Sequence, residues 1–195
     1  MNFAKIGTAS FISFIFIGTI ALFNPPAPEE DIQAYTEVVT AEPKAVNTTK
    51  YVSYDIPDGD TSFKSYMDYR AITNTDSKQY HMQQDAHTGI YGIRMYEDYY
   101  MIAVGSYYAD SIGDILRITL DTDEQFYAIV GDFKADKDTD ILNQYHPMEH
   151  DMINVVEFIV DTQELNRDVR LSGSIGTYKK FNGNIKSIDR IYDYD

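Results

Sequence analysis

Residues 99–134, YYMIAVGSYYADSIGDILRITLDTDEQFYAIVGDFK, contain three runs that are typical of β-strands. Residues 99–104 are almost continuously apolar, as expected for a strand that is buried on both faces. Residues 115–120 alternate between apolar and polar side chains, and the polar turn at 121–124 leads to an apolar run at 126–130. The last two runs are therefore predicted to form a β-hairpin.

Further strand-like segments lie on both sides of this stretch. Residues 51–56 end at a Pro-Asp-Gly-Asp turn, and residues 62–73 alternate enough to predict another strand. Residues 155–160 are strongly apolar, and residues 185–192 resemble a closing strand. Together with 17 tyrosines and 10 phenylalanines, these segments favour a β-rich domain over a helical bundle.

Helices are expected to be few and short. Residues 74–89 are polar and predict a loop or a short helix, and another short helix is expected within residues 162–168. The predicted fold class is therefore mainly β. We expect a small, mostly closed β-barrel with short helices over residues 51–195, with its barrel core at about 91–192.

An apolar segment near the N-terminus predicts export. Residues 6–23 are 18 residues without a charge, which as a helix would span roughly 27 Å of a bilayer core about 30 Å thick. Lys5 precedes the segment and acidic residues 29–31 follow it, so the rest of the chain is expected outside the cell. Residues 1–23 are either a transmembrane signal anchor or a signal peptide that is cleaved. The domain is then held at the cell membrane or secreted.

The composition limits the partners of the chain. Residues 24–50 hold four of the six prolines and many acids, which predicts an extended, disordered linker. The net charge of −15 argues against nucleic acid and anionic polymers as electrostatic partners. The absence of cysteine excludes disulfides and thiolate metal sites.

Three short motifs follow one another in the central stretch. They are IAVG at 102–105, IGD at 112–114 and IVGD at 129–132, and Lys134 follows two residues later. This order resembles the six-stranded double-psi β-barrel of the three-aspartate (3D) domain and of RlpA-like and expansin-like proteins. The resemblance covers about residues 91–161.

The resemblance implies a function on cell-wall glycans, because these families act on peptidoglycan or plant walls. The chain departs from the family pattern at Gly105, which stands where the family has its first aspartate, and at 133–138, which replace a glycine-rich loop. The chain is also similar to uncharacterised exported proteins of gram-positive bacteria.

Asp132 is the candidate catalytic residue that the resemblance supplies. It implies a lytic transglycosylase in which this carboxyl acts as acid and base on a peptidoglycan strand. Because Asp132 follows an apolar strand, partial burial is expected to raise its pKa. Glu157 or Asp161 is the candidate second carboxylate, and Lys134 is expected to hold Asp132 ionised or to contact a substrate oxygen.

A structural role for Asp132 is the alternative, in which it caps a loop or pairs with Lys134. Two hypotheses for the whole domain follow. The first is an enzyme that cleaves wall glycan, and the second is a non-catalytic module that binds the wall or another protein.

Candidate substrate-binding residues follow the first central strand. Tyr107 and Tyr108 have apolar rings with polar tips, which are suited to stacking on sugars if they are exposed, and Ser106 precedes them. A position in the core or at the barrel rim is the alternative for the tyrosines. As a nucleophile, Ser106 is disfavoured because its surroundings lack the Gly-x-Ser-x-Gly pattern.

Aspartates with alternating spacing suggest a calcium loop. Asp136, Asp138 and Asp140 have the spacing of the first three EF-hand ligands, but Ile141 replaces the expected glycine and Pro147 the expected glutamate. An EF-hand is therefore excluded. No metal is predicted, with an irregular calcium site at these aspartates as the alternative.

Histidines allow one further metal hypothesis. His146 and His150 lie beside Asp151 with a spacing that zinc can use, and His81 or His87 would have to complete the site. The sequence lacks an HExxH motif, so ordinary loop histidines are the favoured interpretation. No cofactor is predicted.

Overall fold

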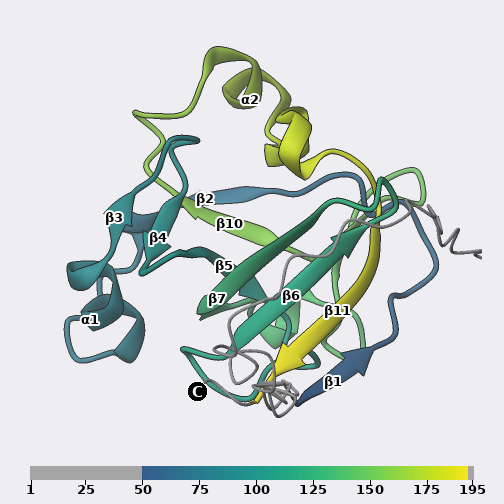
Figure 1. The fold of residues 1–195 in the computed structure, drawn as a ribbon, viewed down its shortest axis with the longest axis horizontal. Helices are drawn as coiled ribbons and strands as arrows, with labels where there is room; N and C mark the ends of the chain where they lie inside the picture. Colours follow the sequence, from purple (N-terminus) through teal and green to yellow (C-terminus); the bar gives the residue numbers. More distant parts are fainter. Residues whose placement is uncertain (1–49, 193–195) are drawn as a thin grey trace, which may run out of the picture. The chain divides into compact units, whose positions relative to one another are not determined.

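A twisted β-sheet of nine strands is the centre of the computed structural model, which describes residues 50–192 (Figure 1). Its hydrogen-bonded order is β1-β11-β6-β7-β5-β10-β2, with β4 beside β5 and β3 beside β4. The strands are β1 (Tyr51–Tyr54), β2 (Tyr66–Asp68), β3 (His87–Thr88), β4 (Arg94–Tyr96), β5 (Tyr99–Val104), β6 (Ile115–Leu120), β7 (Gln125–Phe133), β10 (Glu157–Val160) and β11 (Ile185–Ile191). The mainly-β prediction is therefore confirmed.

Short elements surround this sheet. A separate pair of strands is formed by β8 (His146–Pro147) and β9 (Ile153–Asn154). The helices of the described residues are α1 (Lys78–Asp85), α2 (Arg167–Ser172) and the 3-10 turns η1 (Tyr69–Ala71), η2 (Asp136–Asp138), η3 (Ile175–Thr177) and η4 (Lys179–Phe181).

The central hairpin forms as predicted, and two other segments differ. β6 and β7 pair antiparallel, and β5 and β6 have the predicted bounds. The strand expected over 62–73 is limited to β2, because the Asp68 side chain accepts from Arg70 N and begins the turn η1. The second helix begins at Arg167 because the Asn166 side chain caps it by accepting from Val169 N.

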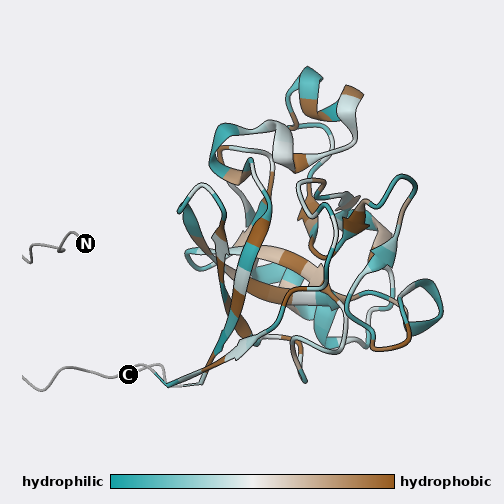
Figure 2. Cartoon of the chain, turned by 90° about the vertical axis from the view of Figure 1, so that its right-hand side faces the viewer, coloured by the Kyte–Doolittle hydropathy of each residue, from teal (hydrophilic) through white to brown (hydrophobic). Residues whose placement is uncertain are grey.

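Two apolar clusters lie on opposite faces of the sheet. Because side chains alternate along a strand, neighbouring residues of β5, β7 and β10 enter different clusters. The large cluster includes Ile102, Val104, Leu116, Ile118, Phe126, Ala128, Val130, Phe158 and Val160. The small cluster consists of Met101, Ile115, Ile129, Ile159 and Ile191, with Met82 of α1 and Tyr69 of η1 among the residues packed on it. Figure 2 shows apolar segments along the strands and hydrophilic segments in many of the connections.

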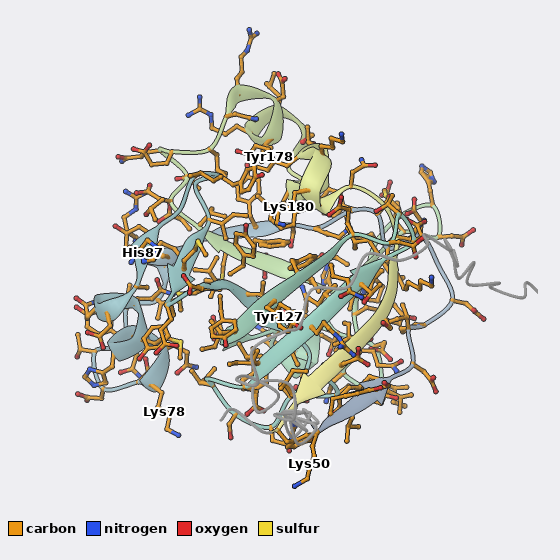
Figure 3. The ribbon with its side chains drawn as sticks, in the orientation of Figure 1. Lys50, Lys78, His87, Tyr127, Tyr178 and Lys180 are labelled. Atoms are coloured by element: carbon orange, nitrogen blue, oxygen red, sulfur yellow. The ribbon has the colours of Figure 1, made fainter. Side chains whose placement is uncertain are left out.

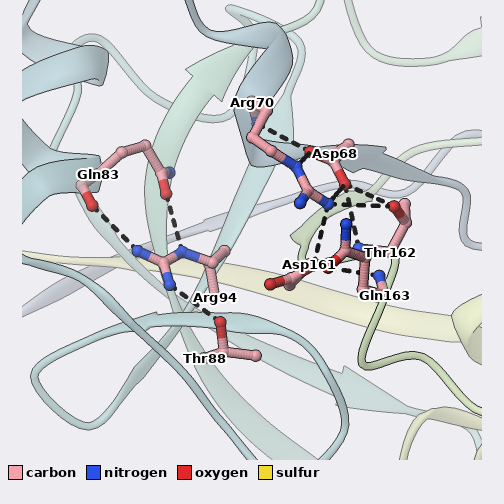
Figure 4. A network of polar contacts seen from close by, with 8 residues as sticks. All are labelled: Asp68, Arg70, Gln83, Thr88, Arg94, Asp161, Thr162 and Gln163. Carbon is pink, nitrogen blue, oxygen red and sulfur yellow. Dashed lines mark hydrogen bonds and ion pairs between the residues drawn. The ribbon is translucent and has the colours of Figure 1, made fainter.

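Arg94 fixes α1 over the face of the small cluster (Figure 4). Its guanidinium donates to the Gln83 carbonyl at 3.0 Å, to Gln83 Oε1 at 3.2 Å, to the Ala86 carbonyl at 2.7 Å and to Thr88 Oγ1 at 2.9 Å. These bonds join the C-terminal half of α1 to β3 and β4. The position of α1 matters for the site, because the helix supplies a contact to Asp132.

The predicted N-terminal segments fall outside the described part of the chain. This holds for the membrane segment at 6–23 and for the linker at 24–50 except its last residue. Among residues 50–192, no helix is both long enough and apolar enough to cross a bilayer.

Candidate functional site

A row of four residues crosses the strands β7, β5 and β10 and the segment before β2, on the face of the small cluster. Ala103 of β5 pairs with Asp132 of β7 on one side and with Glu157 of β10 on the other. Ser65 lies just before β2 and beside Glu157. The backbone N–H of Phe158, the residue after Glu157, donates to the Ser65 carbonyl. Paired residues point to the same face, so Asp132 and Glu157 share a face with their backbones about 10 Å apart, two strand spacings.

A β-bulge in β7 turns Asp132 to this face. The register between β5 and β7 shifts between Ile102 and Ala103, which leaves Gly131 without a paired residue. Val130 faces the large cluster, so regular alternation would have directed Asp132 to that side as well. The extra residue therefore redirects the carboxyl, as bulges commonly do.

Glycine is favoured at the bulge because the backbone lies against the side chains of the small cluster. A Cβ at Gly131 would lie 2.8 Å from Ile159 Cδ1 and 2.9 Å from Met101 Cε. A glycine inside an apolar strand is a sequence signal for such a bulge, and it is the signal that could have predicted the direction of Asp132.

Asp132 is partly buried and has two hydrogen-bond donors. Phe133 N donates to its Oδ1 at 2.9 Å, and Gln79 Nε2 of α1 lies 3.4 Å from the same oxygen. Burial raises the pKa of Asp132, and nearby Glu157 adds to this, while the two donors oppose it; the net result is a raised pKa. This environment agrees with the raised pKa expected from the sequence.

Lys134 lies at the end of β7 and reaches Glu157 on the far side of β5. Its backbone N–H donates to the Val104 carbonyl at 2.9 Å, and its side chain is only 6 % exposed. Its Nζ lies 4.0 Å from Glu157 Oε2. Burial lowers the pKa of Lys134, and Glu157 partly offsets this. Lys134 thus forms its ion pair with Glu157, whereas the sequence suggested Asp132.

Lys134 and Glu157 both line a pocket of about 340 Å³. Its polar lining consists of Ser65, Lys134, Asp138, His146, Asn154 and Glu157. Its apolar lining consists of Phe63, Ala135 and Met148. Asp132 is not one of the lining residues, so the pocket and the predicted acid are neighbours rather than one site.

Hydrogen bonds fix the carboxylate of Glu157 inside the pocket. Ser65 Oγ donates to Glu157 Oε1 at 3.0 Å, and Asn154 Nδ2 donates to Ser65 Oγ at 2.6 Å. His146 Nδ1 donates to the Asp138 carbonyl at 2.6 Å, which orients its ring. Ser65 and Asn154 were not predicted, and they lie 89 positions apart in the chain.

The alternative second carboxylate, Asp161, has a structural role. Its Oδ1 accepts from Arg70 Nη2 at 3.0 Å and from Gln163 N at 3.1 Å (Figure 4). The same arginine forms two bonds of 2.6 Å with Asp68, whose pKa is lowered mainly by this contact. Asp161 therefore ties β10 to η1, and Glu157 is the candidate that shares a face with Asp132.

The expected sugar-stacking residues lie elsewhere. Tyr108 is fully buried in the large cluster, so its ring has no surface for a ligand, in contrast to the expectation. Tyr107 is half-buried and packs edge-to-face on Tyr54 and Tyr108. Ser106 is exposed. None of the three predicted residues lines the pocket.

The aspartates of the possible calcium loop stabilise the backbone of that loop or form part of its turn. Asp140 accepts from the backbone N–H groups of Leu142, Gln144 and Tyr145 at 2.5–3.0 Å. Burial alone would raise the pKa of Asp140, but these donors lower it. Asp136 and Asp138 form the turn η2.

The histidines of the possible zinc site belong to different elements. His146 lies on β8, His81 on α1 and His87 on β3 (Figure 3). His150 and Asp151 have positive φ in a turn before β9. Within residues 50–192, no group of three His, Cys, Asp or Glu side chains is arranged to hold a metal ion.

Gly105 is packed closely against the loop after η2. A Cβ at this position would lie 1.8 Å from the Asn143 carbonyl oxygen, so no side chain fits there.

No family model, curated protein or solved structure matches the chain significantly. The functional assignment therefore rests on the geometry of the pocket and its surroundings.

Proposed function

We propose that this chain is an exported cell-envelope protein whose β domain binds wall glycan in the pocket around Lys134 and Glu157. The observation that carries the proposal is the fixed group of Lys134, Glu157 and Ser65 in a pocket of about 340 Å³. Small-ligand sites combine a few oriented polar groups with apolar walls, which Phe63 and Met148 supply here. Sugars suit such a lining because they have hydroxyls and apolar faces.

We assign the domain to the double-psi β-barrel class. β5 and β7 are parallel neighbours, although the hairpin partner β6 lies between them in sequence. This parallel pair contains the IAVG and IVGD motifs on which the family resemblance rests. The apolar segment at 6–23, as an anchor or a cleaved leader, supports a location outside the cell membrane.

Cleavage of the glycan is the second candidate function. It is favoured by the raised pKa of Asp132 and by the shared face of Asp132 and Glu157. Glycosidases use two carboxyl groups roughly 5–9.5 Å apart, and a backbone separation of about 10 Å is compatible with such a pair. Binding is preferred because Asp132 does not line the pocket.

Co-sedimentation with purified peptidoglycan tests the binding proposal. The full chain in detergent is expected to sediment with the wall, and Lys134→Met and Glu157→Gln are expected to weaken this at least about tenfold. Lys186→Met changes an exposed lysine and is expected to bind like the wild type. A folded wild-type protein that stays in solution would refute the proposal.

Mass spectrometry of the released material tests the second candidate in the same samples. Anhydro-sugar products from the wild type, but not from Asp132→Asn, would establish a lytic transglycosylase. Retention on the wall without any release leaves the binding module as the function.

A further inference from the structure

Two buried lysines of the domain differ in how their ammonium groups are satisfied. Lys64 Nζ donates to the carbonyls of Gly183 at 2.7 Å, Ser62 at 3.2 Å and Thr61 at 3.3 Å. In the described part of the chain, the contact of Lys134 Nζ is Glu157 Oε2 at 4.0 Å, beyond hydrogen-bond length. An ammonium has three donors, and those of Lys134 can reach a ligand or water in the pocket that this residue lines. Lys134, which lines the pocket, is therefore suited to donate to a ligand.

Glu157 limits which kind of ligand group can bind beside Lys134. Its Oε1 accepts from Ser65, while its Oε2 faces Lys134. A ligand atom between Lys134 Nζ and Glu157 Oε2 must accept from the first and donate to the second. A hydroxyl does both, whereas an ionised carboxylate or phosphate can only accept. A hydroxyl oxygen can lie about 2.8 Å from both Lys134 Nζ and Glu157 Oε2, because these two atoms are 4.0 Å apart.

The charge around the pocket also disfavours anions. Asp138 lines the same pocket, so two carboxylates accompany the single lysine. The whole chain has a net charge of −15. An anionic ligand group would therefore meet repulsion both locally and from the surrounding field.

We infer that the pocket binds one ligand hydroxyl between Lys134 Nζ and Glu157 Oε2 and thereby selects uncharged saccharides over carboxylate- or phosphate-bearing ones. This inference rests on the proposed function, because it specifies the sugar that the glycan-binding pocket accepts. It makes Glu157 the residue that determines specificity, while both Lys134 and Glu157 contribute to affinity.

Calorimetric titration of the full chain in detergent with three related sugars tests the inference. The probes are N-acetylglucosamine, its 6-phosphate and N-acetylmuramic acid, which bears a carboxylate. The neutral sugar is expected to bind at least about tenfold more tightly than either anionic sugar. Binding of an anionic sugar as tightly as the neutral one, or no binding of any of the three, would overturn the inference.

Variants separate the two roles. Lys134→Met is expected to abolish binding of the neutral sugar. In Glu157→Gln the side-chain amide can donate to an anionic oxygen, so the preference for the neutral sugar is expected to fall to about threefold or less. An unchanged preference in folded Glu157→Gln would contradict the assigned role of Glu157. Lys186→Met is the control and should keep both affinity and preference.

Failure of this inference is distinguishable from failure of the proposed function. Wild-type protein that sediments with peptidoglycan but binds neutral and anionic sugars equally would refute the selectivity and leave the wall-binding function intact. Protein that binds none of the sugars and does not sediment would refute both.

Discussion

The carbonyl oxygen of Asn143 packs directly against the α-carbon of Gly105, immediately after β5. A Cβ at Gly105 would lie 1.8 Å from this oxygen, and Tyr107 N donates to the same oxygen at 3.3 Å. The contact holds the loop after η2 over the end of β5. Gly131 in β7 is also closely packed, but against the side-chain ends of Ile159 and Met101 instead of against backbone.

Alanine at these two glycines is expected to have unequal costs. Gly105→Ala should destabilise the domain by about 1–3 kcal/mol, because its methyl group meets backbone that cannot move freely. Gly131→Ala should cost less, because Ile159 Cδ1 and Met101 Cε are flexible side-chain ends. Urea unfolding measures both values. A larger cost for Gly131→Ala would contradict the packing described for Gly105.

Lys64 is expected to make stability rise with pH above neutrality. Burial lowers its pKa from 10.5 to about 8. Between these values the unfolded chain holds a proton that the folded protein has released, so the free energy of unfolding increases with pH by at most about 1.4 kcal/mol per unit. Lys134, whose pKa is also lowered, contributes with the same sign.

Urea unfolding at pH 7.5, 8.5 and 9.5 measures this slope. Lys64→Met should reduce the slope, whereas Lys186→Met, at an exposed position, should retain it. A wild-type stability that is constant or falls over this range would be inconsistent with the lowered pKa.

Asp132→Asn and Asp140→Asn are expected to change stability in opposite directions at pH 7. The pKa of Asp132 is raised in the folded protein, so the contribution of this one carboxyl to stability falls as pH rises above about 3.9, and removing its charge should stabilise the domain. The pKa of Asp140 is lowered, so its charge contributes stability that is lost as pH falls through the folded pKa, and removing it should destabilise. Thermal unfolding at pH 7 and pH 3 measures both. The stability change caused by each substitution should be smaller at pH 3. If both substitutions stabilise the domain at pH 7, or both destabilise it, the pKa directions given for the two carboxyl groups are contradicted.

Arg94→Met is expected to loosen α1 while the sheet remains folded. The change removes the donors to the Gln83 and Ala86 carbonyls, so opening of the helix should become easier by about 2 kcal/mol or more. Hydrogen exchange over residues 78–86 should accelerate about 30-fold, whereas amides of β5 and β7 should stay protected. Lys186→Met, an exposed change on β11, serves as the control and should not affect α1.

The central strands could be predicted because their patterns are local. β5 is continuously apolar and β6 alternates, and both have the bounds expected from the sequence. The two-residue strands β3, β8 and β9 were not predicted, since so few residues show no periodicity. Their existence depends on partners supplied by the folded chain.

The site could be predicted only in part. Asp132, Lys134 and Glu157 were identified, but the pairing of Lys134 with Glu157 requires β5 to lie between β7 and β10, which is a property of the sheet order. Ser65 lies in a segment without a motif and gains its role through Glu157, 92 positions away. The sequence left the burial of Tyr108 open, because an exposed and a buried tyrosine after a strand have the same sequence pattern.

The last strand of the domain lies between the first strand and the central strands of the sheet. β11 pairs with β1 on one side and with β6 on the other, so Ile188 has Tyr54 and Ile118 as its neighbours. Until residues 185–191 have been synthesised and released, β6 lacks one neighbour and β1 has none. The strands β5, β6, β7 and β10 can pair before then, but the domain completes its sheet only when its C-terminal strand has left the ribosome.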